Sequence, residues 1–133
     1  MNPATDQSLK NVLIVEDDAA TASILNIWLR NRCNVFPARD GNEALSLISA
    51  LMKKNQEIHL FIFDISIPYP WTGITLKAEI ISRWGVYKGR PFIAETAFAM
   101  PHDQEQITLA GFIEYLTKPL DRTLLVHTVE KYL

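Results

Sequence analysis

Polar side chains that suit phosphoryl transfer directly follow, or end, four separate apolar segments of the sequence. Two of the segments are followed by carboxylates, one ends in a threonine, and one is followed by a lysine. An aspartate can act as a nucleophile, and carboxylates can hold a hard cation such as Mg²⁺. A hydroxyl and an ammonium group can neutralise the phosphoryl oxygens. The residues in question are Glu16, Asp17, Asp64, Thr96 and Lys118.

Any one of these residues alone is typical of an ordinary solvated turn, and their combination is what indicates chemistry. If the first and third apolar segments are neighbouring strands, Glu16, Asp17 and Asp64 converge. Two carboxylates about 5 Å apart repel each other by about 3 kcal/mol at an effective dielectric of 20. Such a cluster needs a proton, a cation or an ammonium group, and Lys118 is the available ammonium.

The elements that must position these residues alternate regularly along the chain. Periodicity predicts five short strands, over residues 12–15, 34–38, 60–63, 91–94 and 112–116. Helices are predicted over 19–31, 43–54, 74–84 and 101–110, with a last helix capped by Asp121. This alternation predicts an α/β fold, with an open parallel sheet covered by helices on both faces. In such sheets ligands bind at the carboxyl ends of the strands, where the candidate residues lie.

Length and composition indicate one soluble globular domain. The chain has 133 residues, of which 48% are apolar and 21% charged, with a net charge of −2. These values give no basis for binding nucleic acid or an anionic membrane. The single cysteine, Cys33, excludes an internal disulfide, and no apolar run approaches the length of a membrane span. We therefore expect a cytoplasmic protein, with a flexible lead over residues 1–10 and one domain over 11–133.

With these residues in place, the chain resembles the receiver domain of two-component response regulators, of the chemotaxis-regulator type. The resemblance extends from Lys10 to Leu133. It implies a flavodoxin-like, doubly wound (βα)5 fold with strand order 2-1-3-4-5. The matching stretches are Val12 to Asp18, Asp40 to Leu45, Asp64 with Pro68, Thr96-Ala97, and Tyr115 to Pro119.

The resemblance also implies a role for each site residue. Asp64 is expected to accept the phosphoryl group, with Mg²⁺ or Mn²⁺ bound directly by Asp17 and through water by Glu16. Ser66 is expected to offer its backbone carbonyl to the metal. Thr96 is expected to be the switch hydroxyl, Lys118 the phosphate-binding lysine and Tyr115 the aromatic switch residue.

Two positions depart from the family pattern. Gly73 lies nine residues after Asp64 rather than eight, so the loop over residues 69–72 is expected to be longer. Trp71 of this loop either anchors it or contacts a partner. Glu95 stands where an apolar residue commonly precedes the switch threonine. We expect Glu95 to reach solvent at the strand end, and a role in tuning the metal site is the alternative.

The lifetime of the phosphorylated state is expected to depend on Ser66 and Phe98. These residues lie two positions after the acceptor and two after the switch threonine, and in the family such positions flank the path of the hydrolytic water. Ser66 is too short to hold that water, and Phe98 is apolar. We expect Phe98 to shield the phosphoryl group, with simple packing on the loop as the alternative.

The resemblance predicts a switch that receives a phosphoryl group from a histidine kinase or a histidine phosphotransfer protein. Such a domain catalyses only its own phosphorylation and dephosphorylation, and is not a turnover enzyme. The expected output is contact with a downstream protein through the fourth helix, fifth strand and fifth helix, without nucleic acid or membrane binding. One alternative is a pseudo-receiver that keeps the fold without the chemistry. A flavodoxin-like cofactor binder is disfavoured, because carboxylates stand where a phosphate would lie.

Overall fold

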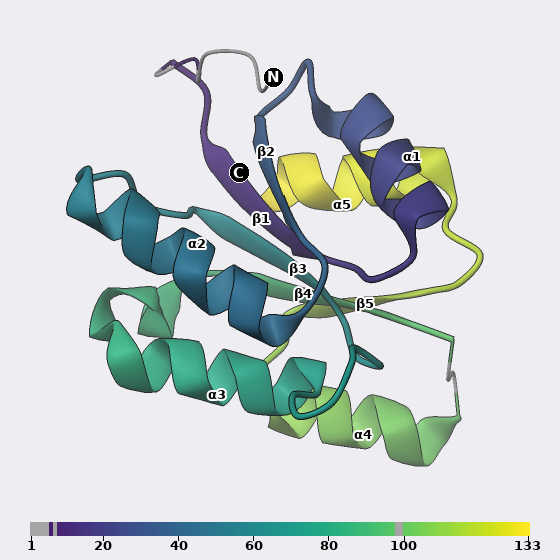
Figure 1. The fold of residues 1–133 in the computed structure, drawn as a ribbon. Coiled ribbons are helices and arrows are strands. Elements are labelled where there is room, and N and C mark those ends of the chain that lie inside the picture. Colours follow the sequence, from purple (N-terminus) through teal and green to yellow (C-terminus); the bar gives the residue numbers. More distant parts are fainter. Residues whose placement is uncertain (1–5, 7, 98–99) are drawn as a thin grey trace.

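The computed structural model describes residues 6, 8–97 and 100–133, in which five parallel strands form one sheet (Figure 1). The strands are β1 (Asn11–Val15), β2 (Asn34–Ala38), β3 (Leu60–Asp64), β4 (Phe92–Thr96) and β5 (Glu114–Thr117). Their order in the sheet is β2-β1-β3-β4-β5, which confirms the predicted order. The edge position of β2 suits Pro37, because proline cannot donate to a strand ladder.

Helices cover both faces of this sheet. They are α1 (Ala19–Leu29), α2 (Gly41–Lys53), α3 (Gly73–Arg83), α4 (Pro101–Leu109) and α5 (Arg122–Tyr132). Figure 1 shows α1 and α5 on one side of the sheet and α2, α3 and α4 on the other. The buried residues accordingly form two cores, one against α1 and α5 and one against α2, α3 and α4.

Strand alternation decides which core each strand residue joins. On β3, Leu60 and Ile62 belong to the α1/α5 core, whereas Phe61 and Phe63 belong to the other. The aromatic rings gather on the α2/α3/α4 side, where Phe61 stacks on Phe92 with ring centroids 4.2 Å apart. Because neighbouring parallel strands are in register, residues that pair across the strands point to the same face at the strand ends.

The observed elements differ from the sequence prediction mainly before β4 and β5. A 3₁₀ helix, η1 (Gly85–Gly89), follows α3 and was not predicted. The predicted strand over 112–116 begins instead at Glu114, because the Phe112 amide still bonds to the Ile107 carbonyl at the end of α4. The predicted strand over 91–94 begins at Phe92, since Pro91 has no N–H to donate.

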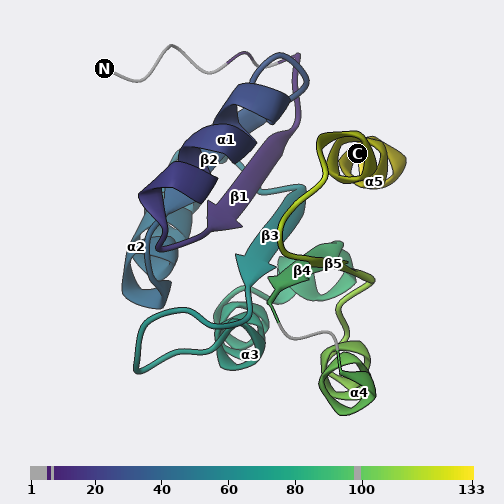
Figure 2. The same ribbon diagram turned by 90° about the vertical axis from the view of Figure 1, so that its right-hand side faces the viewer.

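Helix caps fix where the chain leaves the strand-end loops. The side chains of Asp18, Asp40 and Asp121 accept hydrogen bonds from backbone amides at the starts of α1, α2 and α5. Thr72 and Thr75 form a reciprocal capping box at the start of α3. The starts of these helices therefore lie at the same edge of the sheet as the carboxyl ends of the strands. Figure 2 shows β1 and β3 pointing toward this edge together.

No helix in the described part of the chain is long and apolar enough to span a membrane. The Asp6 amide and carbonyl, ahead of β1, form hydrogen bonds with the Asn34 side chain. The predicted boundary between a lead over residues 1–10 and a domain over 11–133 stays a prediction.

Candidate functional site

The register of the sheet brings three carboxylates side by side at its carboxyl edge. Val15 pairs with Phe63, so Glu16 and Asp64 follow at the same level, and Asp64 itself pairs with Glu95. One carboxylate oxygen from each of Glu16, Asp64 and Glu95 lies within 4.8 Å of the other two. These side chains come from β1, β3 and β4, which are neighbours in the sheet. The convergence of Glu16 with Asp64 is as predicted from the sequence.

Lys118 supplies the ammonium group that such a cluster needs. Its Nζ lies 2.9 Å from Glu16 Oε1 and 2.9 Å from Asp64 Oδ2. The Lys118 backbone amide donates to the Thr96 carbonyl at 2.8 Å, which extends the ladder between β4 and β5 to this residue. The lysine is thereby held on the sheet, and its side chain reaches across to the carboxylates of β1 and β3.

The acceptor candidate has a further hydrogen bond and little exposure. Asp64 is 5% exposed, and its Oδ1 accepts a 2.9 Å hydrogen bond from the Ser66 backbone amide. Its second oxygen, Oδ2, accepts from Lys118. Both oxygens of the Asp64 carboxylate are therefore oriented by the protein.

Glu95 is fully buried, and our expectation that it reaches solvent is wrong. The residue is 0% exposed, and neither carboxylate oxygen has a hydrogen-bond partner among the described residues. The reason is register: Glu95 pairs with Asp64 of the central strand, so it still belongs to β4 and not to the loop that follows. Its position next to Thr96 in the sequence, on a strand predicted to be central, was the available signal.

Burial also changes the proton affinity of the acidic groups. Burial raises the pKa of Glu95 to about 9, and the nearby Glu16 carboxylate adds to the rise. Burial likewise raises the pKa of Glu16, although the neighbouring Glu95 side chain and then Lys118 oppose this. Without a cation, Glu95 is therefore protonated and neutral at pH 7.

Lys118 responds in the opposite sense. Burial alone would lower the pKa of Lys118, but its hydrogen bonds to Asp64 and Glu16 outweigh burial and raise it. The ammonium group stays charged across the physiological pH range, so it can neutralise one of the carboxylates.

The remaining candidate residues lie around this cluster. Asp17 and Ser66 are exposed beside it, and Asp17 does not belong to the group of three converging carboxylates. Thr96 is 1% exposed, and alternation places it on the α2/α3/α4 face together with the half-buried Tyr115. Phe98, the predicted shield, lies outside the described residues.

Trp71 is attached to the start of α2. Its Nε1 donates to Asn42 Oδ1 at 2.9 Å, and its ring lies so close to Gly41 that a Cβ there would be 2.3 Å from Cδ1. Gly73 is equally constrained, because a Cβ there would lie 2.9 Å from the Asp64 carbonyl oxygen. These contacts favour the anchoring role of Trp71 over a partner contact, and they hold the longer loop against the site.

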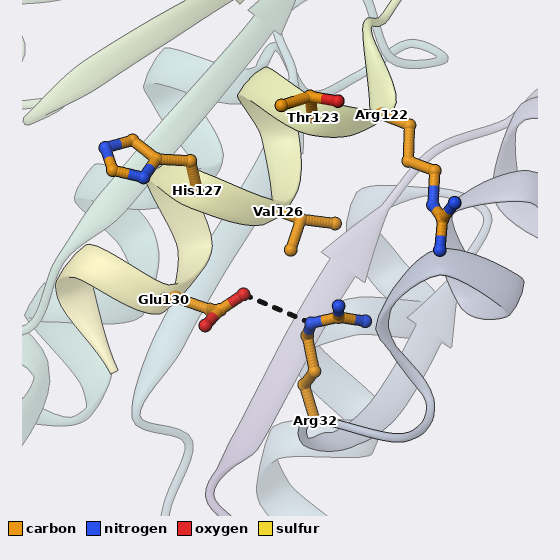
Figure 3. A pocket seen from close by; sticks show the side chains of 6 residues that line it. All are labelled: Arg32, Arg122, Thr123, Val126, His127 and Glu130. Carbon is orange, nitrogen blue, oxygen red and sulfur yellow. Dashed lines mark hydrogen bonds and ion pairs between the residues drawn. The ribbon is translucent and has the colours of Figure 1, made fainter.

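A separate open hollow of about 320 Å³ lies between the end of α1 and α5 (Figure 3). Its lining residues are Arg32, Arg122, Thr123, Val126, His127 and Glu130. An ion pair of 3.2 Å between Arg32 and Glu130 crosses it. This hollow contains none of the residues that the sequence nominates for chemistry.

The donor set at the carboxyl edge fits a hard divalent cation. Its atoms are carboxylate oxygens, which Mg²⁺ and Mn²⁺ prefer over nitrogen or sulfur. The unpartnered oxygens of Glu95 show that the cluster has more acceptors than the protein's own donors satisfy. A cation of charge +2 would neutralise the negative charge that Lys118 alone leaves uncompensated.

Comparisons with known proteins agree with this geometry. The model of the family described as response regulator receiver domain matches residues 12–130. The polar-differentiation response regulator DivK of Brucella anthropi is 27% identical over 129 residues, covering 93% of this chain and 96% of DivK.

Two further proteins contain segments similar to this chain. Hybrid signal transduction histidine kinase G of Dictyostelium discoideum is 33% identical over 129 residues, which are 95% of this chain but 4% of that kinase. A solved structure of the Saccharomyces cerevisiae histidine phosphotransfer signaling protein Ypd1 with the receiver domain of its downstream response regulator Ssk1 also matches. The TM-score is 0.77 at 27% identity, covering 93% of this chain and 88% of that one.

Proposed function

Because the chain belongs to the response regulator receiver domain family of two-component and phosphorelay systems, we propose that it accepts a phosphoryl group on Asp64. The observation that carries this proposal is the contact of Lys118 with both Asp64 and Glu16 at 2.9 Å. That contact supplies the nucleophile, its counter-charge and an acidic neighbour in one place. The pseudo-receiver alternative is not favoured, because Asp64, Glu16 and Lys118 converge.

The carboxylate of Asp64 acts as the nucleophile in this proposal. Its oxygen attacks the phosphorus of the donor, a phosphohistidine or a small acyl phosphate, and the donor oxygen or nitrogen leaves. The Ser66 amide holds Oδ1 of Asp64 and thereby orients the carboxylate before attack. The Lys118 ammonium lies against Oδ2 and is placed to neutralise charge on the transferred group.

The cation that we propose for this site is Mg²⁺ or Mn²⁺, held by Asp17, Asp64 and the Ser66 carbonyl, with Glu16 acting through water. When bound, such a cation neutralises the charge of the phosphoryl oxygens and orients them for in-line transfer. Glu16 is 2% exposed and fixed by Lys118, so it is positioned rather than mobile. No turnover of an external substrate is part of this proposal.

The proposed output is a change of surface at α4, β5 and α5. In this proposal, Thr96 donates to the phosphoryl group, and Tyr115, which shares its sheet face, turns into the space that is freed. The phosphoryl group need only favour one of two existing states. We propose a sensor histidine kinase or a histidine phosphotransfer protein as the donor, and a downstream protein as the target, in the cytoplasm.

Phosphorylation of the intact chain by acetyl phosphate tests this function, with the mass of the protein as the readout. We expect the mass to increase by one phosphoryl group with Mg²⁺ but not with a chelator, and not in Asp64→Asn. Asp103→Asn, which changes an aspartate of α4, should behave as wild type and serves as the matched control. Equal labelling of Asp64→Asn would place the acceptor elsewhere. An unlabelled wild type that also fails to bind Mg²⁺ would favour the pseudo-receiver.

A further inference from the structure

Glu95 stands apart from every other buried polar group of the site. Its two carboxylate oxygens are the only fully buried side-chain nitrogen or oxygen atoms of the described residues that lack a hydrogen-bond partner. Ionising a buried carboxyl group without a partner is costly, because nothing replaces the water it has lost. The protein keeps it nonetheless, at a position beside the proposed acceptor.

Two simple explanations for Glu95 fail on the geometry. The residue is 0% exposed, so solvent does not hydrate it. Lys118 does not satisfy it either, because its ammonium group is within 2.9 Å of Glu16 and of Asp64 and pairs with these two. The cluster therefore contains one more acidic side chain than Lys118 pairs with.

The separation of the three carboxylates suits a shared cation. Their oxygens lie within 4.8 Å of one another. Two oxygens on opposite sides of an ion that binds each at about 2.1 Å are about 4.2 Å apart. The cluster is therefore close to the size at which one small divalent cation could be reached from more than one carboxylate.

We propose that Glu95 is an additional carboxylate ligand of the divalent cation, beside Asp64. The inference rests on the proposed function, because it concerns the cation of the same site. Three carboxylates and one ammonium group carry a charge of −2 when all are ionised, which one divalent cation neutralises. The chain would thus bind its cation more tightly than a receiver domain with an apolar residue before the switch threonine.

Calorimetric titration of the full chain with Mg²⁺, and separately with Mn²⁺, tests the energetic consequence. Glu95→Gln keeps the shape of the side chain but cannot lose a proton to become an anionic ligand. We expect the dissociation constant to rise at least about tenfold, which is about 1.4 kcal/mol. Glu105→Gln, which removes an exposed glutamate of α4, should bind as wild type does. Equal or tighter binding by Glu95→Gln would overturn the inference.

A second measurement separates ligation from the mere loss of a nearby charge, and it needs no variant. In wild-type protein labelled with carbon-13, the side-chain carboxyl resonance of Glu95 is followed during the Mg²⁺ titration. Ligation predicts that it shifts together with that of Asp64. A Glu95 resonance that does not shift, while that of Asp64 does, would overturn the inference even if Glu95→Gln binds weakly.

These outcomes distinguish the inference from the function on which it rests. If the wild type binds the cation and Asp64 responds without Glu95, only the role of Glu95 is wrong. If the wild type binds neither cation, the proposed cation site fails as well. Circular dichroism of Glu95→Gln establishes that a changed affinity does not come from lost structure.

Discussion

The two ends of the sheet bury polar groups in opposite ways. At the amino end, the Asn11 side chain donates to the Glu57 carbonyl at 2.8 Å and accepts from the Asn34 amide at 3.0 Å. The buried Tyr87 hydroxyl accepts from the Ile58 backbone amide at 3.1 Å. Donors and acceptors are matched there, and the groups are neutral apart from the rim.

At the carboxyl end, three buried carboxyl groups lie together, and a single ammonium group pairs with only two of them. Lys118 pairs with Glu16 and Asp64, and Glu95 has no partner among the described residues. A set of polar groups with matched donors and acceptors stabilises a fold. An unmatched set lowers stability and leaves acceptors available to a ligand. The amino end therefore serves structure, and the carboxyl end serves the proposed chemistry.

The largest effect on stability is expected from breaking the contact of Lys118 with the carboxylates. Lys118→Met leaves Glu16 and Asp64 buried without their counter-charge, so the free energy of unfolding should fall by about 3 kcal/mol. Lys131→Met removes an exposed pair with Glu114 and should cost less than about 1 kcal/mol. Urea unfolding of the cation-free proteins measures both. Equal losses of unfolding free energy in the two variants would show that Lys118 does not stabilise the buried carboxylates of Glu16 and Asp64.

The next effect is a dependence of stability on pH that originates in Glu95. Its pKa is raised from 4.5 to about 9 in the folded protein, so the folded state holds this proton more tightly than the unfolded state does. The resulting stabilisation is complete below pH 4.5 and is lost as the pH rises toward about 9. The loss is at most about 1.4 kcal/mol per pH unit.

Urea unfolding in the presence of a chelator, at several pH values between these limits, measures this slope. Glu95→Gln cannot titrate and should flatten it, and the control Glu105→Gln should retain it. A slope that is the same in wild type and in Glu95→Gln would contradict the assignment of the proton to Glu95.

At the amino end, a smaller loss of stability should leave the chemistry intact. Tyr87→Phe removes the hydroxyl that accepts from Ile58, so a buried amide loses its partner and the free energy of unfolding should fall by about 1–2 kcal/mol. Phosphorylation by acetyl phosphate, measured well below the unfolding temperature, should proceed at the wild-type rate. A slowed reaction would mean that the two ends of the sheet are coupled.

The smallest effect is expected in the loop beside the site. Trp71→Phe keeps an aromatic ring against Gly41 but removes the hydrogen bond to Asn42. The bond is exposed, so the cost should stay below about 1 kcal/mol. Thermal unfolding measures the cost. A loss above about 2 kcal/mol would show that the loop is a main support of the fold rather than a cover for the site.

The sequence predicted the architecture well because the apolar segments alternate so regularly with helical ones. The strand order is as predicted, and so is the convergence of Glu16 with Asp64, whereas Asp17, also predicted to converge with them, is not in the group of carboxylates. Two features could not be predicted. The 3₁₀ helix η1 has no periodicity to reveal it, since Gly85 and Gly89 flank a short turn. The second is the burial of Glu95, because glutamate is almost never fully buried and is expected to be exposed at a strand end.

The central claim, that Asp64 of the carboxyl edge carries the phosphoryl group, is tested most directly by locating the modified residue. The chain is phosphorylated with acetyl phosphate and Mg²⁺ and reduced with borohydride, which converts a phosphoaspartate to homoserine. Peptide mass spectrometry then identifies the position. The account predicts homoserine at position 64. Homoserine at Asp17, Asp18 or another aspartate, with position 64 unchanged, would contradict it.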